Sequence, residues 1–348
     1  MVVLRQIFYL GISSSLLYAL LVVAAMLIYP PILDGTMDTL SIHNRAGKIF
    51  TNSPRYLVWN RSSLDRPTSK IILIGSSNLR AALNLDTLQT KLPAIDVHNL
   101  SVGGMNITQM TQIVDLALEI IPKEALPATN FVAALSFALF VENDHRWRVY
   151  EKLPGSRVEM EMRRFGLYRR TAEGLGPIVP PRSISALALG LWPLLAISSA
   201  RHQVRKFWRS NIDEEDASVP DMRQTEQRDK AMRMWQAYVG RPDQRLAPEQ
   251  FDELVKLSRK IRGSGAKLTI LDMPLPRWFV STSPYDADYQ LKKRRYFPQA
   301  LVGPDASLID LRNMDRIEDY RDSGHLNRRA GDRFSERLAD HLAKMTGQ

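Results

Sequence analysis

The sequence contains no cysteine among its 348 residues. This absence excludes disulfide bonds, thiolate catalysis and cysteine-ligated metal sites. Zinc-finger spacings, basic-region heptads and the aromatic signature of ribonucleoprotein domains are missing as well, so we expect no nucleic-acid partner. The sequence also lacks internal repeats and low-complexity linkers. The formal net charge of +10 indicates attraction to polyanions, and it does not by itself distinguish anionic lipid from acidic polysaccharide.

Charged residues are absent from one long stretch near the N-terminus, residues 7–29, which follows Arg5. About 20 predominantly apolar residues span a bilayer, whereas the apolar region of a signal peptide has roughly 7–15. The stretch therefore predicts an uncleaved anchor in a bacterial inner membrane. A short, positively charged N-terminus stays in the cytoplasm. We accordingly expect a single-pass protein whose remaining residues lie on the extracytoplasmic side, in the periplasm.

Short apolar runs that alternate with amphipathic segments indicate an α/β fold. A continuous apolar run rich in β-branched residues is typical of a strand buried on both faces. Alternation of such strands with helices favours right-handed crossovers and a parallel sheet. We predict a three-layer α/β/α domain with a parallel five-stranded sheet. The predicted strands are residues 71–74, 95–101, 131–137, 267–273 and 308–311, and the predicted helices are residues 85–92, 106–121, 248–262 and a C-terminal helix with Ala330, Phe334, Leu338, Leu342 and Met345 on its apolar face.

The alternation divides the chain into an anchor, a connector and one interrupted domain. The anchor is residues 1–29, and residues 30–69 form a polar, irregular connector. The α/β domain covers residues 70–348 and is interrupted by an insertion at about 138–246, where the alternation lapses. Within the insertion, the acidic and polar stretch 213–229 predicts a flexible surface loop. Past the insertion, Gly263 is predicted to close the helix at 248–262.

Three residues at the predicted carboxyl edge of the sheet indicate nucleophilic catalysis. A serine is a weak nucleophile unless a histidine takes its proton, and that histidine needs an acid to orient it. Ser77 follows the first strand, with Ser76 as the rival nucleophile. Of the six histidines, only His325 follows a predicted strand and has an acid, Asp322, three residues before it. We therefore expect a ring nitrogen of His325 to lie within hydrogen-bond distance of Ser77 Oγ.

The same edge of the sheet offers donors for an oxyanion. Backbone N–H groups near Ser77 can supply one donor, and the close backbone approach that Gly103 and Gly104 allow can supply another. Asn78 is a further possible polar contributor. The cluster from Glu142 to His145 is too crowded for helical metal-ligand spacing and has no second half, so we predict neither a metal nor a cofactor.

Three motifs resemble blocks I, II and V of the SGNH (GDSL-type) hydrolase superfamily. They are Gly75-Ser-Ser77 after the first strand, Asn99-Leu-Ser-Val-Gly-Gly104 after the second, and Asp322-Ser-Gly-His325 before the last helix. The resemblance covers residues 70–137 and 267–342 and leaves the insertion unmatched. It implies a flavodoxin-like SGNH fold.

The resemblance also implies specific roles for these residues. Ser77 would be the nucleophile and an oxyanion donor through its N–H. Gly104 would be the second oxyanion donor, His325 the base and Asp322 the acid that orients it.

Two departures from the family pattern indicate which branch of the superfamily the sequence resembles. Ser76 stands where the family has an aspartate before its nucleophile. The Gly-x-Asn-Asp motif of block III is missing, because the third strand ends in Ser136-Phe-Ala-Leu139. Asn143 is a candidate substitute for the block III asparagine, although it lies a few residues beyond the position that the family pattern requires. These features are similar to a membrane-anchored, extracytoplasmic branch that acts in O-acylation of cell-envelope polymers. That branch includes the D-alanine transfer protein of teichoic acid synthesis and exopolysaccharide acetylation proteins, and its members work beside a multi-spanning acyltransferase.

The resulting hypothesis is a serine acyltransferase that O-acylates, most simply O-acetylates, a cell-envelope or secreted polysaccharide. The polysaccharide would be the acceptor, and a multi-spanning membrane O-acyltransferase would supply the acyl donor. Two alternatives stay open at this point. One is an anchored carbohydrate or lipid esterase that uses the same triad. The other is a non-catalytic scaffold that binds the acyltransferase or the glycan, which the missing block III favours.

A second uncharged run, residues 183–200 between Arg182 and Arg201, raises the question of another membrane crossing. A single crossing here would separate Ser77 from His325 on opposite sides of the membrane. We therefore predict a buried or membrane-surface helix, with the basic residues 201–209 as a lipid-facing flank. The other basic run, residues 292–295, is interpreted as solvated surface.

Overall fold

The computed structural model describes residues 2–28, 64–101, 103–142, 168–171, 174–177, 222–239, 243 and 245–346. These residues belong to two compact units. The first comprises Met1–Leu64 and Glu159–Asp213, and the second comprises Asp65–Val158 and Glu214–Gln348. The second unit contains the sheet and every predicted site residue that the structure describes.

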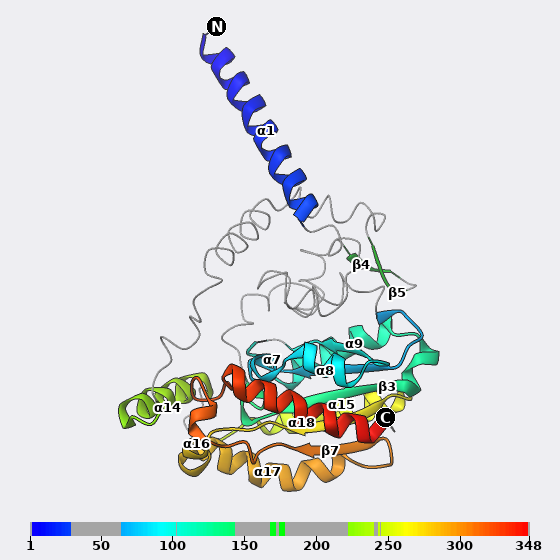
Figure 1. Cartoon of the computed structure of the whole chain (residues 1–348), viewed down its shortest axis with the longest axis vertical. Helices are drawn as coiled ribbons and strands as arrows, with labels where there is room; N and C mark the ends of the chain where they lie inside the picture. Colours follow the sequence, from blue (N-terminus) through cyan, green and yellow to red (C-terminus); the bar gives the residue numbers. More distant parts are fainter. Residues whose placement is uncertain are drawn as a thin grey trace. The chain divides into compact units, whose positions relative to one another are not determined.

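The second unit is built on a parallel sheet of five strands in the order β2-β1-β3-β6-β7 (Figure 1). The predicted parallel five-stranded sheet is therefore confirmed. All residues of β1 and β3 are buried, as their continuous apolar runs predict. The strands are β1 (Lys70–Gly75), β2 (Asp96–Asn99), β3 (Thr129–Leu135), β6 (Lys267–Asp272) and β7 (Ala306–Asp310).

Two groups of helices accompany the sheet (Figure 1). In one group, α18 (Arg328–Thr346) packs against α7 (Ser77–Ala82) and α8 (Leu85–Lys91). In the other, α15 (Pro248–Gly263) packs against α9 (Ile107–Ile120) and α17 (Pro284–Ala300). The remaining elements among the described residues of this unit are α14 (Thr225–Val239), α16 (Arg277–Thr282) and the 3-10 helices η1 (Lys123–Ala128), η2 (Phe137–Leu139) and η4 (Ile317–Asp319).

Local sequence signals account for where several helices begin. The Asn84 side chain accepts hydrogen bonds from the first N–H groups of α8. Asn106 and Gln109 form a reciprocal capping box at the start of α9, and such caps stabilise a helix by about 1 kcal/mol. The apolar face of α18 is buried at Ala330, Phe334, Leu338 and Leu342, as predicted, whereas Met345, which was assigned to the same face, is exposed. These helices are the ones that the sequence pattern located well.

Three predictions about the second unit are corrected. The helix α15 runs through Gly263, and it is Gly265, with φ 89°, that adopts the left-handed conformation after it. The stretch 213–229 was predicted to be a flexible loop, but its last five residues form the first turns of α14. The basic run 292–295 lies on α17, where Lys292 and Lys293 form ion pairs and are not simply solvated.

The first unit contains the N-terminal helix α1 (Val2–Ile28) and a hairpin of β4 (Tyr168–Thr171) and β5 (Gly174–Pro177). Among the described helices, one is long and apolar enough to cross a membrane, and its candidate span is Val3–Leu21. This finding confirms an apolar N-terminal helix at the place where the anchor was predicted. Residue 29 of the predicted anchor, residues 30–63 of the predicted connector, the run 183–200 and the basic flank 201–209 lie outside the described residues.

Candidate active site

The turn from β1 into α7 brings Ser77 to the carboxyl end of a central strand. Gly75 makes this turn possible, because a Cβ atom there would lie 3.0 Å from both Cβ and the carbonyl oxygen of Ala134 and 3.1 Å from Leu79 Cδ2. Glycine thus lets β1, β3 and α7 pack in close contact. Ser77 begins α7 two residues later and is partly exposed, whereas the rival Ser76 is only 4% exposed. Ligands of open parallel sheets bind at this edge.

A tight turn between η4 and α18 presents the acid and the histidine together. Asp322 Oδ1 accepts hydrogen bonds from the backbone N–H groups of Gly324, at 2.9 Å, and His325, at 2.8 Å. The carbonyl oxygen of His325 accepts the N–H of Arg321 at 3.0 Å, and Tyr320 pairs with Leu326 as an antiparallel bridge. The turn is therefore fixed largely by its own backbone.

The three predicted residues form a continuous hydrogen-bonded chain. His325 Nε2 lies 2.9 Å from Ser77 Oγ, and His325 Nδ1 lies 2.7 Å from Asp322 Oδ2. The contact predicted between Ser77 and His325 is confirmed. With the Nδ1 proton donated to Asp322, Nε2 is free to accept the hydroxyl proton of Ser77. This is the arrangement that activates a serine in acyl transfer.

The electrostatics of Asp322 suit a residue that remains ionised. Burial by itself raises the pKa of this carboxyl, but the opposing effects are larger. The hydrogen bond and charge of the His325 ring, together with the N–H groups of Gly324 and His325, hold the pKa of Asp322 below its usual value. An ionised Asp322 can orient the His325 ring and stabilise its protonated form.

Gly103, the first of the two predicted oxyanion glycines, lies beside the nucleophile. A Cβ atom on Gly103 would come within 3.8 Å of Ser77 Cβ and 3.7 Å of Arg80 Nη2. Gly104 has φ 71°, a left-handed conformation that favours glycine. The double-glycine turn therefore approaches Ser77 as expected, and hydrogen-bond donation by the N–H groups of Ser77 and Gly104 stays a prediction.

Of the two additional polar candidates, the structure describes only Asn78, which is too deeply buried to contact a bound substrate. Asn78 is 3% exposed and packs beneath the turn, 3.4 Å from the position a Gly324 Cβ would occupy. Its Nδ2 atom is shielded from solvent and has no hydrogen-bond partner among the described residues. Asn143 lies outside the described residues. At the end of β3, where the SGNH family has its block III asparagine, Ser136 is fully buried.

A contact that the sequence did not reveal joins the turn to α14. Trp235 Nε1 donates a hydrogen bond of 2.8 Å to Ser323 Oγ, between Asp322 and His325 in the chain. Both residues are buried. The polar composition of α14, in which Trp235 and Val239 are the buried residues, left no clear periodic signal. A tryptophan three residues before a tyrosine inside a polar segment was the available hint.

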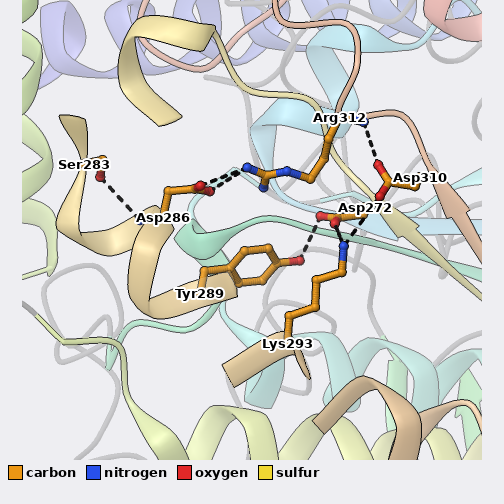
Figure 2. Close-up of polar contacts among 7 residues, drawn as sticks. All are labelled: Asp272, Ser283, Asp286, Tyr289, Lys293, Asp310 and Arg312. Atoms are coloured by element: carbon orange, nitrogen blue, oxygen red, sulfur yellow. Dashed lines mark hydrogen bonds and ion pairs between the residues drawn. The ribbon is translucent and has the colours of Figure 1, made fainter. Parts of the chain in front are cut away.

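A second polar cluster occupies the carboxyl ends of β6 and β7 (Figure 2). Asp272, which is fully buried, pairs with Lys293 and accepts a 2.9 Å hydrogen bond from the Tyr289 hydroxyl. Arg312 donates two 2.9 Å hydrogen bonds from one nitrogen to the carboxylate of Asp286. Burial raises the pKa of Asp272, although the charge of Lys293 acts in the opposite direction.

Every charged side chain of this second cluster is paired with another, and three of its residues, Asp286, Tyr289 and Lys293, come from α17. The cluster therefore fastens α17 to the edge of the sheet. Within the described residues, no group of three histidine, aspartate or glutamate side chains is arranged to hold a metal ion, and His145 lies outside that part of the chain. The hydrogen-bonded chain of Ser77, His325 and Asp322 is thus the candidate active site.

Comparison of the sequence with protein-family models and with curated proteins gives no match. The assignment of chemistry to this site therefore rests on its own geometry.

Proposed function

We propose that this protein is a membrane-anchored serine acyltransferase of the SGNH type that O-acylates a cell-envelope or exopolysaccharide, with acetyl as the simplest acyl group. The observation that carries the proposal is the chain from Ser77 Oγ through His325 to Asp322, with distances of 2.9 and 2.7 Å. Two features support the SGNH type. The chain stands at the carboxyl edge of a parallel five-stranded sheet, and α18 packs against α7 while α15 packs against α9, as in a three-layer fold.

The reaction would proceed through an acyl-serine. His325 Nε2 takes the proton of Ser77 Oγ as that oxygen attacks the carbonyl carbon of the acyl donor. The tetrahedral intermediate collapses when the bond to the donor's leaving oxygen breaks, and protonated His325 returns the proton to that oxygen. Ser77 now carries the acyl group as an ester, and Asp322 has stabilised the imidazolium throughout.

The second half of the reaction repeats the first in reverse. His325 takes the proton of a sugar hydroxyl, which attacks the acyl-serine carbonyl. The bond to Ser77 Oγ breaks, and His325 reprotonates the serine. N–H groups of Ser77 and Gly104 would stabilise the oxyanion in both halves. Water at the same position would give hydrolysis, so transfer requires an acceptor that is held better than water.

The apolar α1 supports placing this chemistry at a membrane surface. Because Arg5 precedes the apolar stretch, the positive-inside tendency directs the remainder of the chain to the extracytoplasmic side. A multi-spanning membrane O-acyltransferase is the proposed source of the acyl donor, and the polysaccharide is the acceptor. The proposed reaction therefore takes place in the periplasm, on a cell-envelope or secreted polymer.

The proposal is tested by mass spectrometry of the full-length protein after reaction with p-nitrophenyl acetate. We expect one acetyl group on Ser77, and its transfer to an added acetyl-free oligosaccharide of the envelope. Ser77→Ala should abolish the adduct, while Ser76→Ala, which removes the neighbouring buried hydroxyl, should retain it. An acetyl-serine that is cleared only by water would indicate the esterase alternative. Absence of any adduct on Ser77 would overturn the catalytic reading in favour of a scaffold.

A further inference from the structure

The indole of Trp235 contacts the turn that carries the catalytic acid and histidine at two points. Its Nε1–H donates to Ser323 Oγ at 2.8 Å. Its Cζ2 atom lies 3.6 Å from the position that a Cβ on Gly324 would occupy. These are the two residues between Asp322 and His325, so one side chain hydrogen-bonds the first and lies close to the second.

Trp235 is itself fixed by aromatic neighbours from two other elements. Its ring meets Phe137 edge-on, with centroids 4.9 Å apart, and Phe279 at 6.2 Å. Phe137 begins η2, directly after the central strand β3, and Phe279 lies on α16. Both phenylalanines are fully buried. The indole therefore connects the rigid edge of the sheet with the Asp322–His325 turn.

We propose that Trp235 is a positioning residue, which holds the Asp322–His325 turn where His325 Nε2 faces Ser77 Oγ. The inference rests on the proposed function only in requiring that Ser77 be an activated nucleophile. Trp235 does not touch the reacting atoms, and its effect passes through Ser323 to the histidine two residues later. Displacement of a catalytic group by about 1 Å can cost roughly a hundredfold in rate.

The contact of Trp235 connects the insertion to the active site. The turn's own hydrogen bonds set its internal shape, but they do not fix the turn relative to β3. Trp235 supplies one such link, through Phe137, and it lies on α14, inside the region 138–246 that interrupts the sequence resemblance. Part of the insertion is therefore a component of the active-site framework, and a binding partner that displaced α14 would act directly on the position of His325.

The test measures labelling of Ser77 in the full-length protein by a fluorophosphonate probe. In this reaction Ser77 Oγ bonds to phosphorus, fluoride leaves, and His325 takes the hydroxyl proton. Trp235→Phe keeps an aromatic ring and removes the N–H, and Ser323→Ala removes the acceptor. We expect each variant to lower the maximal labelling rate roughly fivefold, the effect of one buried neutral hydrogen bond. The probe concentration that gives half the maximal rate should stay unchanged.

Two controls separate positioning from general damage. Trp278→Phe is the matched variant, because Trp278 is also buried beside Phe279, yet its Nε1 has no partner in the described part of the chain. It should label at the wild-type rate. The double variant of Trp235→Phe with Ser323→Ala should be no slower than either single variant, because both remove the same bond.

The outcomes distinguish this inference from the proposed function. If wild-type Ser77 labels and Trp235→Phe labels equally fast, the positioning role is overturned and the proposed function stands. The role is also overturned if Trp278→Phe slows labelling as much as Trp235→Phe does. If wild-type Ser77 fails to label, the activated nucleophile is absent and both proposals fall.

Discussion

Ser77 Oγ lies 2.9 Å from His325 Nε2 although 248 positions separate the two residues in the chain. The contact depends on the return of α18 from the β7 edge of the sheet to α7 and α8. Ser335 of α18 accepts a 2.7 Å hydrogen bond from the N–H of Asn84, between α7 and α8. Packing of the last helix therefore contributes to the distance between nucleophile and base, beside the contact of Trp235 with the turn.

Removal of the base should nearly abolish acyl-serine formation. His325→Gln leaves Ser77 without an acceptor that can carry its proton away, so we expect the rate to fall by about 10³-fold or more. Stopped-flow release of p-nitrophenol measures this rate. His341→Gln, at an exposed position on α18, is the control and should leave the rate unchanged. A His325→Gln protein that acylates at the wild-type rate would show that another group acts as the base.

Replacement of the orienting acid should reduce the rate while leaving the nucleophile in place. Asp322→Asn cannot stabilise the imidazolium and favours the wrong tautomer of His325, and in serine proteases the equivalent change costs about 10⁴-fold. The same assay applies. Asp340→Asn removes a carboxylate of an exposed pair with Lys91 and serves as the charge-matched control. Equal rates for the two variants would contradict the role given to Asp322.

The low pKa of Asp322 makes the stability of the fold depend on acid. Because the folded-state pKa lies below the usual 3.8, the ionised carboxyl contributes stability that is present above about pH 4 and is lost as the pH falls through the folded pKa. Urea unfolding at pH 6 and at pH 3 should show a larger loss for the wild type than for Asp322→Asn. An identical loss in both proteins would count against the depressed pKa.

A side chain at the strand end before the nucleophile should disturb both fold and activity. Gly75→Ala would place a Cβ 3.0 Å from backbone and side-chain atoms of Ala134, and such overpacking costs roughly 1–3 kcal/mol. Urea unfolding measures the change. Gly263→Ala, on α15 with nothing within 4 Å of the new Cβ, is the control and should be neutral or slightly stabilising. No destabilisation by Gly75→Ala would mean that β1, β3 and α7 are packed less closely.

Breaking the buried pair in the second polar cluster should destabilise the domain. Lys293→Met leaves the fully buried Asp272 without its counter-ion, which costs about 3–5 kcal/mol when a buried partner is removed. Lys256→Met, whose ammonium is exposed and lies 3.7 Å from Glu253, should change the free energy of unfolding by less than about 1 kcal/mol. Equal effects of the two changes would show that Asp272 is not held by Lys293.

The sequence by itself determined the sheet and the hydrogen-bonded chain of three residues. Runs such as Ile71–Ile74 are long enough and apolar enough to be buried on both faces, and that pattern is local. The Asp-x-x-His spacing of residues 322–325 is also local, because one tight turn suffices to present both side chains. Parallel strands then bring their carboxyl ends to the same edge, so the approach of His325 to Ser77 could be predicted without coordinates.

The tertiary structure alone decided what surrounds these residues. The hydrogen bond from Trp235 to Ser323 joins positions 88 residues apart, and α14 is a polar helix whose buried residues, Trp235 and Val239, give a weak periodic signal. Only packing shows that Asn78 lies beneath the turn and that Ser76 is enclosed. Burial is a property of everything that covers a residue, and those neighbours come from distant parts of the chain. Local patterns therefore identified the three candidate site residues, and long-range packing determined which other residues support them.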